Sequence, residues 1–275
     1  MTLLLSWASF DDGKSEPAAI YIAADSRISW ASGEKWDWAQ KVFCSPASAE
    51  VFGYCGDVMC VTQTLSQIVS LSNLEAFSPS LTPVERIELY CSLLRQTLKS
   101  YPATEIVSAS AVIYATRFEN RYHVYEIKIG KDAGITYEAI VFSKNKDGHS
   151  SKTRPDRIVR GSGTSNFNIR SPSETSYQAF HRFCDCLESG AVSSVGGAPQ
   201  VVTIRRNGDC LLYGISLLNE NRVLGLPVTE LEKFSGITEW KNENFERWDP
   251  VAQKRTAGAQ AQPRFSAKKD NRKLP

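Results

Sequence analysis

The strand-like and helix-like segments of this 275-residue chain come in separate runs, and this order restricts its fold class more than any other feature. Apolar segments of strand length come first, two helical patterns follow, and further strand-like segments surround a third helix. The strand-like segments are 2–8, 18–24, 40–44, 50–55, 106–116, 121–129, 136–142, 157–160, 200–206 and 210–216. Runs segregated in this way favour layered α+β domains over alternating βαβ units. We therefore expect an α+β fold, a four-layer αββα sandwich with two sheets between two helical layers.

Local signals mark where the helices and one hairpin begin. Gly56 and Asp57 follow a strand-like segment, and Asp57 is a good N-cap for the first helix. Thr82–Glu85 is a capping box with proline at the first helical position, so it opens the second helix. Ser171–Glu174 is a further capping box and predicts the start of the third helix. Asn207–Gly208 between two strand-like segments predicts a tight hairpin.

The distribution of charge separates the end of the chain from the rest. Residues 251–275 carry seven Lys or Arg against Asp270 alone, and they contain few large apolar residues. We expect 251–275 to be a basic disordered tail, after a domain at 2–228 and an extension at 229–250 that packs on its surface. Without the tail, the net charge of +2 becomes about −4. This balance argues against a nucleic-acid-binding body.

The composition also argues against membrane, secreted and metal-binding proteins. No window holds 18 consecutive apolar residues, and 3–5 is too short for a signal-peptide core, so we expect a cytoplasmic protein. The seven cysteines are an odd number and mostly stand in apolar stretches, where we expect reduced core thiols. Cys184 and Cys186 are separated by a single residue, which is not the spacing of a zinc site. We therefore predict no metal and no cofactor.

Four short segments resemble one protein family through their joint order and spacing. They are Met1–Thr2 before a strand, Ala23–Arg27, Lys41–Phe43 followed by Gly53–Asp57, and Gly161–Gly163. In this order they resemble the proteasome β-subunits and their bacterial relatives, the HslV-type peptidases and the Anbu proteins, over about residues 2–215. The resemblance implies an N-terminal-nucleophile hydrolase.

The resemblance assigns the nucleophile to Thr2 and the general base to its own α-amine, which is freed when Met1 is removed. An unperturbed α-amine has a pKa of about 7.7–8.0 and is largely protonated near neutral pH. A neighbouring ammonium lowers that pKa, and Lys41 is the implied source. Asp25 precedes Lys41 by 16 residues, as in the family, and would hold its ammonium by a charge-assisted hydrogen bond.

The resemblance also assigns two supporting roles and shows one departure. The backbone N–H of Gly53, at the turn before the first helix, would stabilise the oxyanion, and Ser162 would orient the α-amine. Proteasome β-subunits usually carry an Asp-x-x-Ser-Gly-Gly motif after the third helix. Here Val192 and Val195 replace the Asp and the Ser, whereas both glycines are present. This departure weakens the prediction of catalysis.

The resemblance also predicts, from sequence position, a substrate pocket beside the nucleophile. None of its predicted lining residues is charged, so we expect a preference for apolar or small P1 side chains. The predicted lining residues are Ile28, Ala39, Phe43, Val51 and Cys55.

Each site residue also has a plainer interpretation when taken alone. Thr2 fits the start of an edge strand, and Asp25 with Lys41 fits an ordinary surface ion pair. Gly53 fits a tight turn, and Ser162 fits a cap for the following segment.

The leading interpretation of function is a proteasome-like threonine peptidase or amidohydrolase. We expect peptide or protein substrates and a homo-oligomeric ring, with an ATPase unfoldase as a candidate partner. The alternative is a catalytically inactive scaffold or regulatory subunit of the same fold, favoured by Val192 and Val195. A non-peptidase amidohydrolase of the wider superfamily is a third interpretation.

Overall fold

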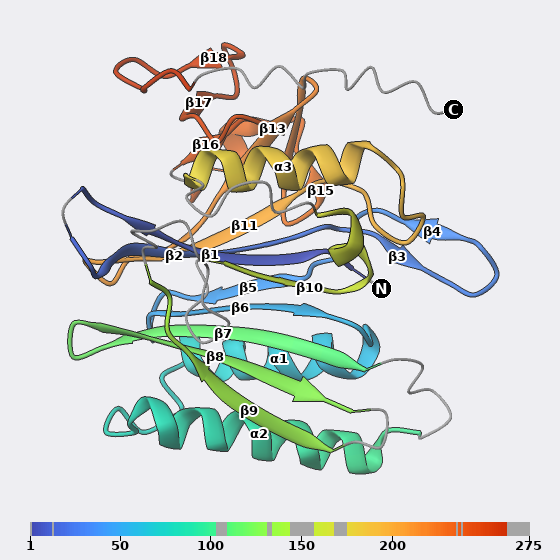
Figure 1. Ribbon diagram of the computed structural model, residues 1–275, viewed down its shortest axis with the longest axis vertical. Helices are drawn as coiled ribbons and strands as arrows, with labels where there is room; N and C mark the ends of the chain where they lie inside the picture. The colour runs from blue at the N-terminus through green and yellow to red at the C-terminus, as the bar shows by residue number, and fades with distance from the viewer. Residues whose placement is uncertain are drawn as a thin grey trace, which may run out of the picture.

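Two five-stranded antiparallel sheets form the centre of the structure, a computed structural model (Figure 1). It describes residues 2–12, 14–102, 109–130, 134–143, 157–167, 175–234, 236–237 and 239–262. The first sheet has the order β10-β1-β2-β11-β12, with β1 Leu4–Phe10, β2 Pro17–Ala24, β10 Arg157–Arg160, β11 Gln200–Arg205 and β12 Cys210–Leu212. The second has the order β5-β6-β7-β8-β9, with β5 Val42–Ser45, β6 Glu50–Cys55, β7 Ser110–Phe118, β8 Arg121–Ile129 and β9 Ile135–Ile140.

The two sheets pack face to face through one apolar cluster. Successive side chains of a strand point to opposite faces, so one set from each strand can fill the space between the sheets. Leu4 and Ile22 of the first sheet meet Val42, Val51 and Ile113 of the second in this cluster. Four of these side chains are completely buried, and Leu4 is almost so.

Two helices cover the outer face of the second sheet. α1 spans Met59–Asn73 and α2 spans Pro83–Ser100. Their apolar sides pack on the other set of strand side chains, which includes Phe52 and Tyr54. The predicted capping box of the second helix is confirmed, because the Thr82 hydroxyl accepts from Glu85 N–H and the Glu85 carboxylate accepts from Thr82 N–H.

A third helix, α3 (Ser176–Glu188), covers the outer face of the first sheet. Phe180 and Phe183 of this helix share a buried cluster with Leu3 and Leu5. α3 is capped at Thr175 by a capping box. The capping box expected at 171–174 lies outside the described residues. The α+β class is confirmed by this order of strands and helices.

The C-terminal region departs from the predicted boundaries. β13 (Gly214–Leu217), β14 (Glu220–Val223), β15 (Leu226–Pro227) and β16 (Trp240–Lys241) form one sheet, which crosses the expected domain end at 228. β17 (Trp248–Asp249) pairs with β18 (Lys254–Arg255).

The prediction that the whole of 251–275 is disordered is therefore wrong for 251–262. The Asp249 carboxylate accepts from two backbone N–H groups of the β17–β18 turn, and Gln262 N–H donates to Glu246. These contacts order a segment whose composition alone indicates disorder. Residues 263–275 lie outside the described residues.

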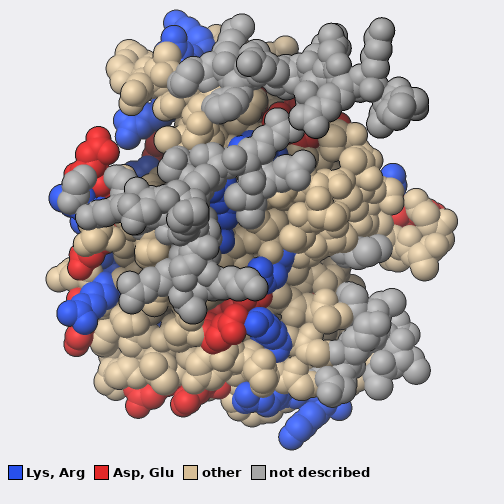
Figure 2. Space-filling view, in the orientation of Figure 1, with Lys and Arg blue, Asp and Glu red and all other residues tan. Residues whose placement is uncertain are grey.

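Short elements complete the described chain. β3 (Ile28–Ser29) and β4 (Lys35–Trp36) form a separate hairpin, η2 spans Ser162–Asn166 and η3 spans Leu231–Lys233. No helix in the described ranges is long and apolar enough to cross a membrane. On the face shown in Figure 2, basic and acidic side chains are interspersed.

Candidate active site

The ends of several strands meet at one edge of the two sheets, on the side where Figure 1 marks the N-terminus. Antiparallel pairing places the start of β1 beside the ends of β2 and β10, and the start of β5 beside the end of β6. Thr2 precedes β1, Asp25 follows β2, Lys41 precedes β5 and Ser162 follows Gly161 at the end of β10. The topology thus gathers residues that are far apart in sequence.

Asp25 and Lys41 form a completely buried ion pair between the two sheets. The Lys41 Nζ–Asp25 Oδ1 distance is 2.9 Å, and both side chains have 0% exposure. The Lys41 ammonium also donates to the backbone carbonyl of Arg27. Burial lowers the pKa of Lys41, and the adjacent Asp25 carboxylate opposes that shift. The interpretation as an ordinary surface ion pair is therefore wrong.

The Asp25 carboxylate also organises the backbone around the pair. Its Oδ1 accepts a second hydrogen bond, of 3.1 Å, from the N–H of Leu3. Its Oδ2 accepts from Gly196 N–H at 3.2 Å and from Arg27 N–H at 3.3 Å. One oxygen atom therefore joins the Lys41 ammonium to the residue that follows Thr2.

Thr2 is completely buried, and its hydroxyl oxygen is buried with it. Its Oγ1 has no hydrogen-bond partner among the residues that the structure describes. Its carbonyl oxygen accepts from Gly163 N–H at 3.5 Å and lies so close to Gly161 that an added Cβ there would be 1.9 Å away. Gly161 also has φ +93°, a conformation that favours glycine. Since β1 lies between β10 and β2, the edge-strand interpretation of Thr2 is wrong.

Ser162 stands between these two glycines and forms a hydroxyl pair with Ser194. The two Oγ atoms are 3.0 Å apart, and Ser194 is buried. The sequence comparison placed the missing family serine at Val195, whose side chain instead packs in the apolar cluster under α3. The hydroxyl that lies beside Ser162 belongs to Ser194, one residue earlier.

Arg27 belongs to the motif at 23–27, but the sequence assigned it no role. In the structure its side chain connects three segments by hydrogen bonds. Its guanidinium binds the Asp37 carboxylate through two hydrogen bonds of 2.6 and 2.8 Å. Arg27 Nη1 also donates to the carbonyl oxygens of Ser193 and Val195. The hydrogen bond from Arg27 lowers the pKa of Asp37. An added Cβ on Gly196 would be 2.5 Å from Arg27 Cζ, so this glycine makes room for the guanidinium.

Gln200, at the start of β11, holds the backbone on either side of the ion pair. Its Oε1 accepts from Lys41 N–H at 3.0 Å, and its Nε2 donates to the Ala39 carbonyl at 2.6 Å. Both contacts are buried. Sequence reasoning missed Gln200 because only the pairing of β11 with β2 brings it to this edge.

The prediction that Gly53 lies at the turn before α1 is wrong. Gly53 lies within β6, where it faces Val42 and Ile113 on the two neighbouring strands. Tyr54 N–H donates to Lys41 on the β5 side, so the N–H of Gly53 points the other way, toward β7. An added Cβ at Gly53 would be 2.4 Å from a methyl of Ile22. Close packing of the two sheets therefore explains this glycine.

The sharp turn is at Gly56 instead. Gly56 has φ +111°, and an added Cβ would be 2.3 Å from Ser110 Oγ. The same hydroxyl accepts a 2.7 Å hydrogen bond from Asp57 N–H, which fixes the turn against the start of β7. The N-cap position of α1 is Val58 and not Asp57 as predicted, but the Asp57 carboxylate accepts from Cys60 N–H in the first turn of the helix.

The five residues expected to line a substrate pocket do not share one surface. Phe43 belongs to the cluster under α1 and α2, whereas Val51 and Cys55 face the other sheet. Val51 is completely buried in that core. Ile28 lies in β3 and Ala39 is a buried residue beside Lys41. The prediction of a single pocket is therefore wrong, because alternation along β5 and β6 separates its members.

The surroundings of Cys55 are also more polar than predicted. The Arg160 guanidinium binds the Glu126 carboxylate through two hydrogen bonds, with Nη2–Oε2 at 2.7 Å. Both charged groups act on the Cys55 thiol, whose pKa is raised to about 11, chiefly by burial. The described residues contain no group of three or more His, Cys, Asp or Glu side chains placed to hold a metal ion.

Comparisons with known proteins support a relationship of fold. No family model matches the sequence, and no curated protein matches it. The structure is similar to Anbu (ancestral β-subunit) from Yersinia bercovieri, with a TM-score of 0.52 and 12% identity over 77% of this chain and 87% of that one. A Gly-1 mutant of Anbu from Hyphomicrobium sp. strain MC1 gives a TM-score of 0.49 and 11% identity over 86% of this chain and 92% of the mutant. The chain therefore shares the fold of this ancestral β-subunit. The sequence identity of 12% is too low to show more than the fold.

Proposed function

We propose that this chain is a threonine-type N-terminal-nucleophile hydrolase, a peptidase or amidase with the αββα sandwich of that class. The observation that carries the proposal is the Asp25 carboxylate oxygen that accepts from both the Lys41 ammonium and the N–H of Leu3. This contact puts a buried cation beside the start of the chain, where the hydroxyl of Thr2 is without a partner in the described structure.

In this proposal, hydrolysis of the Met1–Thr2 bond exposes the α-amine of Thr2. The Lys41 ammonium lowers the pKa of that amine, so more of it is neutral near pH 7 and able to accept a proton. The amine takes the hydroxyl proton as Oγ1 attacks the substrate carbonyl. The protonated α-amine then gives this proton to the leaving nitrogen of the substrate. The substrate C–N bond breaks, the amine product leaves, and the acyl group stays on Thr2 Oγ1 as an ester. Water hydrolyses that ester and restores the hydroxyl.

The negative oxygen of the tetrahedral intermediate needs a fixed donor. We assign that role to a backbone N–H of the turn at Gly56, in place of Gly53, whose N–H points into the sheet. Ser110 supports the assignment because it fixes this turn through Asp57 N–H. Loss of one such donor typically raises the barrier by about 2.7–4 kcal/mol.

Ser162 and Ser194 would orient the α-amine. Gly161 and Gly163, on either side of Ser162, both contact the carbonyl of Thr2, which keeps Ser162 beside the N-terminus. Ser194 would replace the family serine that is absent at Val195.

The second candidate function is an inactive scaffold of the same fold. It is favoured by Val192 and Val195, which pack with the cluster under α3 and supply no polar group to the site. The two candidates share a fold and differ in whether Thr2 reacts.

Assembly into a homo-oligomeric ring, with peptides or proteins as substrates, is part of the proposal. Trp30, Trp36 and Trp38 lie on or beside the β3–β4 hairpin and are each about half exposed, at 50%, 46% and 47%. Tryptophan is enriched at the centres of protein interfaces, so this hairpin is a reasonable contact between subunits. An ATPase unfoldase remains a candidate partner.

Two measurements test the proposal. Intact mass of the protein from its native host should show that Met1 is absent, and a peptide epoxyketone should then form an adduct on Thr2. A chain that keeps Met1, or a folded chain with Thr2 free but unlabelled, would favour the scaffold. Ser194→Ala should slow labelling, whereas Ser193→Ala is the matched control, because Ser193 is exposed and contributes only its carbonyl.

A further inference from the structure

The turn between β14 and β15 reaches from the C-terminal sheet to the candidate active site. It consists of Leu224 and Gly225, which both have a positive φ, of +51° and +85°. Two such residues form the tight hairpin turn that matches the twist of its strands. Gly225 is buried, although Leu226 and Pro227, which follow it, are exposed. This part of the turn therefore faces the inside of the protein.

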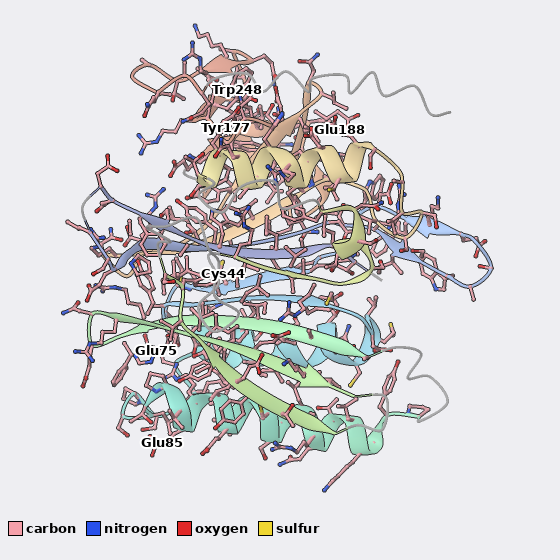
Figure 3. All side chains as sticks on the ribbon, in the orientation of Figure 1. Cys44, Glu75, Glu85, Tyr177, Glu188 and Trp248 are labelled. Carbon is pink, nitrogen blue, oxygen red and sulfur yellow. The ribbon has the colours of Figure 1, made fainter. Side chains whose placement is uncertain are left out.

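Packing holds Leu224 in this uncommon conformation. A bulky residue with a positive φ is rare, so its surroundings must stabilise it. The Leu224 side chain packs on the apolar cluster between the two central sheets and also on the C-terminal cluster around Trp240. In Figure 3, Trp248 of the C-terminal cluster is labelled at the top of the view, and Cys44 of the central cluster nearer the middle. Leu224 therefore joins the C-terminal region to the core between the sheets.

Gly225 packs directly on residues that adjoin the buried ion pair. An added Cβ would lie 2.9 Å from Ser26 Cβ, 3.4 Å from Gln200 Nε2 and 3.5 Å from the Ala39 carbonyl oxygen. Ser26 follows Asp25 in the chain. These three neighbours of Gly225 are almost completely buried. The turn thus covers the hydrogen bond between the Gln200 amide and the Ala39 carbonyl.

Gln200 connects this contact to Lys41. Gln200 pairs with Ala24 across β11 and β2 and so belongs to the first sheet, whereas Lys41 precedes β5 of the second. Its amide accepts from Lys41 N–H at 3.0 Å and donates to the Ala39 carbonyl at 2.6 Å. Because a glutamine amide is both donor and acceptor, one side chain fixes two points of the same backbone segment.

We propose that Gln200 and the β14–β15 turn are positioning residues that fix Lys41 beside Thr2. Gln200 holds the Lys41 backbone by its N–H, and from there the Lys41 ammonium reaches the Asp25 carboxylate. The inference rests on the proposed function, in which that ammonium acts on the α-amine of Thr2, an effect that weakens with distance. The C-terminal region thus supports the site without supplying a catalytic residue.

The first test compares two glycines of the C-terminal region in the whole chain after removal of Met1. Gly225→Ala should lower the maximal rate of Thr2 labelling by a peptide epoxyketone at pH 7 at least about tenfold, because the new methyl group displaces Ser26. The epoxyketone concentration for half the maximal rate should not change. Gly258→Ala is the matched control, since Gly258 has φ +75° and an added Cβ meets nothing within 4 Å in the described structure. Equal rates for the two variants would overturn the proposal.

The pH dependence of labelling separates a change in position from a loss of folded protein. When the Lys41 ammonium lies farther from the α-amine, the pKa of that amine rises. The rate profile of Gly225→Ala should therefore shift to higher pH than that of the wild type. Partial unfolding would lower the labelled fraction and leave the profile where it was. A slower rate with an unshifted profile would overturn the positioning role.

Gln200→Met should slow labelling and shift the profile in the same way. Its matched control is Gln253→Met, because Gln253 also donates to a backbone carbonyl at 2.6 Å, that of Pro250, away from the site. Gln200→Glu keeps the size of the side chain, so it serves if Gln200→Met does not fold. Burial raises the pKa of such a carboxyl group, and only its neutral form donates to the Ala39 carbonyl. The labelling rate of Gln200→Glu relative to wild type should therefore fall as the pH rises, and a constant ratio would overturn the role of Gln200.

The wild-type protein separates this inference from the proposed function. An unlabelled wild type would refute the proposed function, and the inference with it. A labelled wild type would keep the proposed function. If Gly225→Ala and Gln200→Met were then labelled at the wild-type rate, the inference alone would be overturned.

Discussion

Replacing Asp25 by alanine should strip the buried Lys41 ammonium of its only carboxylate partner among the described residues. The ammonium would keep the Arg27 carbonyl, while the N–H groups of Leu3 and Gly196 would lose their acceptor. Removing one partner of a buried ion pair typically costs about 3–5 kcal/mol. Native domains are stable by roughly 5–15 kcal/mol, so Asp25→Ala should remove about a fifth or more of the free energy of unfolding.

Urea denaturation measures this loss in the free energy of unfolding. The direction in which the loss changes with pH can also be predicted. Burial already lowers the pKa of Lys41, and loss of Asp25 removes the main group that raises it. Between that lowered pKa and the ordinary lysine value, the unfolded chain binds more protons than the native one, so stability rises with pH. The destabilisation of Asp25→Ala should therefore shrink as the pH is raised toward 10.

Two further variants decide whether the reasoning is right. The double variant Asp25→Leu/Lys41→Met should regain most of the free energy of unfolding that Asp25→Ala loses, because no unpaired charge stays buried. Glu138→Ala breaks an exposed pair with Lys128 and should cost no more than about 1 kcal/mol. A cost for Asp25→Ala as small as that of Glu138→Ala, or a deficit that does not change with pH, would refute the account of a buried pair.

Three other predictions concern Gly161, the hydrogen bonds to Glu50, and Lys41. Gly161→Ala should destabilise the protein by more than Gly33→Ala in thermal unfolding, since both glycines have a positive φ but only Gly161 is packed against a carbonyl; equal effects would contradict this. Tyr114→Phe removes one of the donors to buried Glu50 and should cost about 1.5–3 kcal/mol in urea unfolding, and no change would exclude a role for that bond. Hydrolytic activity should fall at high pH, as Lys41 loses its proton below the ordinary lysine value, and a rate that stays constant up to that value would argue against a charged Lys41.

The parts of the site that sequence predicted are those fixed by short local motifs. Asp25 follows β2 and Lys41 precedes β5, and these strands belong to different sheets, so the order and spacing of the motifs in the resemblance predicted their meeting. The capping box at Thr82 likewise depends on four consecutive residues. Such local patterns carry their own geometry and can be interpreted without the fold.

The parts that sequence missed depend on a role carried over by resemblance or on distant pairing. The strand expected at 50–55 agrees with β6, but the resemblance placed Gly53 of that strand at the turn, which lies at Gly56 instead. The predicted pocket was wrong because the face of Phe43 is set by the register of β5. Ser194 and Gln200 reach the site only through tertiary packing, and no local pattern marks them.

The central claim concerns the α-amine of Thr2, and a direct titration tests it. In protein that lacks Met1 and carries ¹⁵N-threonine, NMR can follow the protonation of that amine against pH. We predict a pKa below the ordinary range of about 7.7–8.0, which returns toward that range in Lys41→Met. A pKa within or above the ordinary range, unchanged by Lys41→Met, would contradict the proposed base.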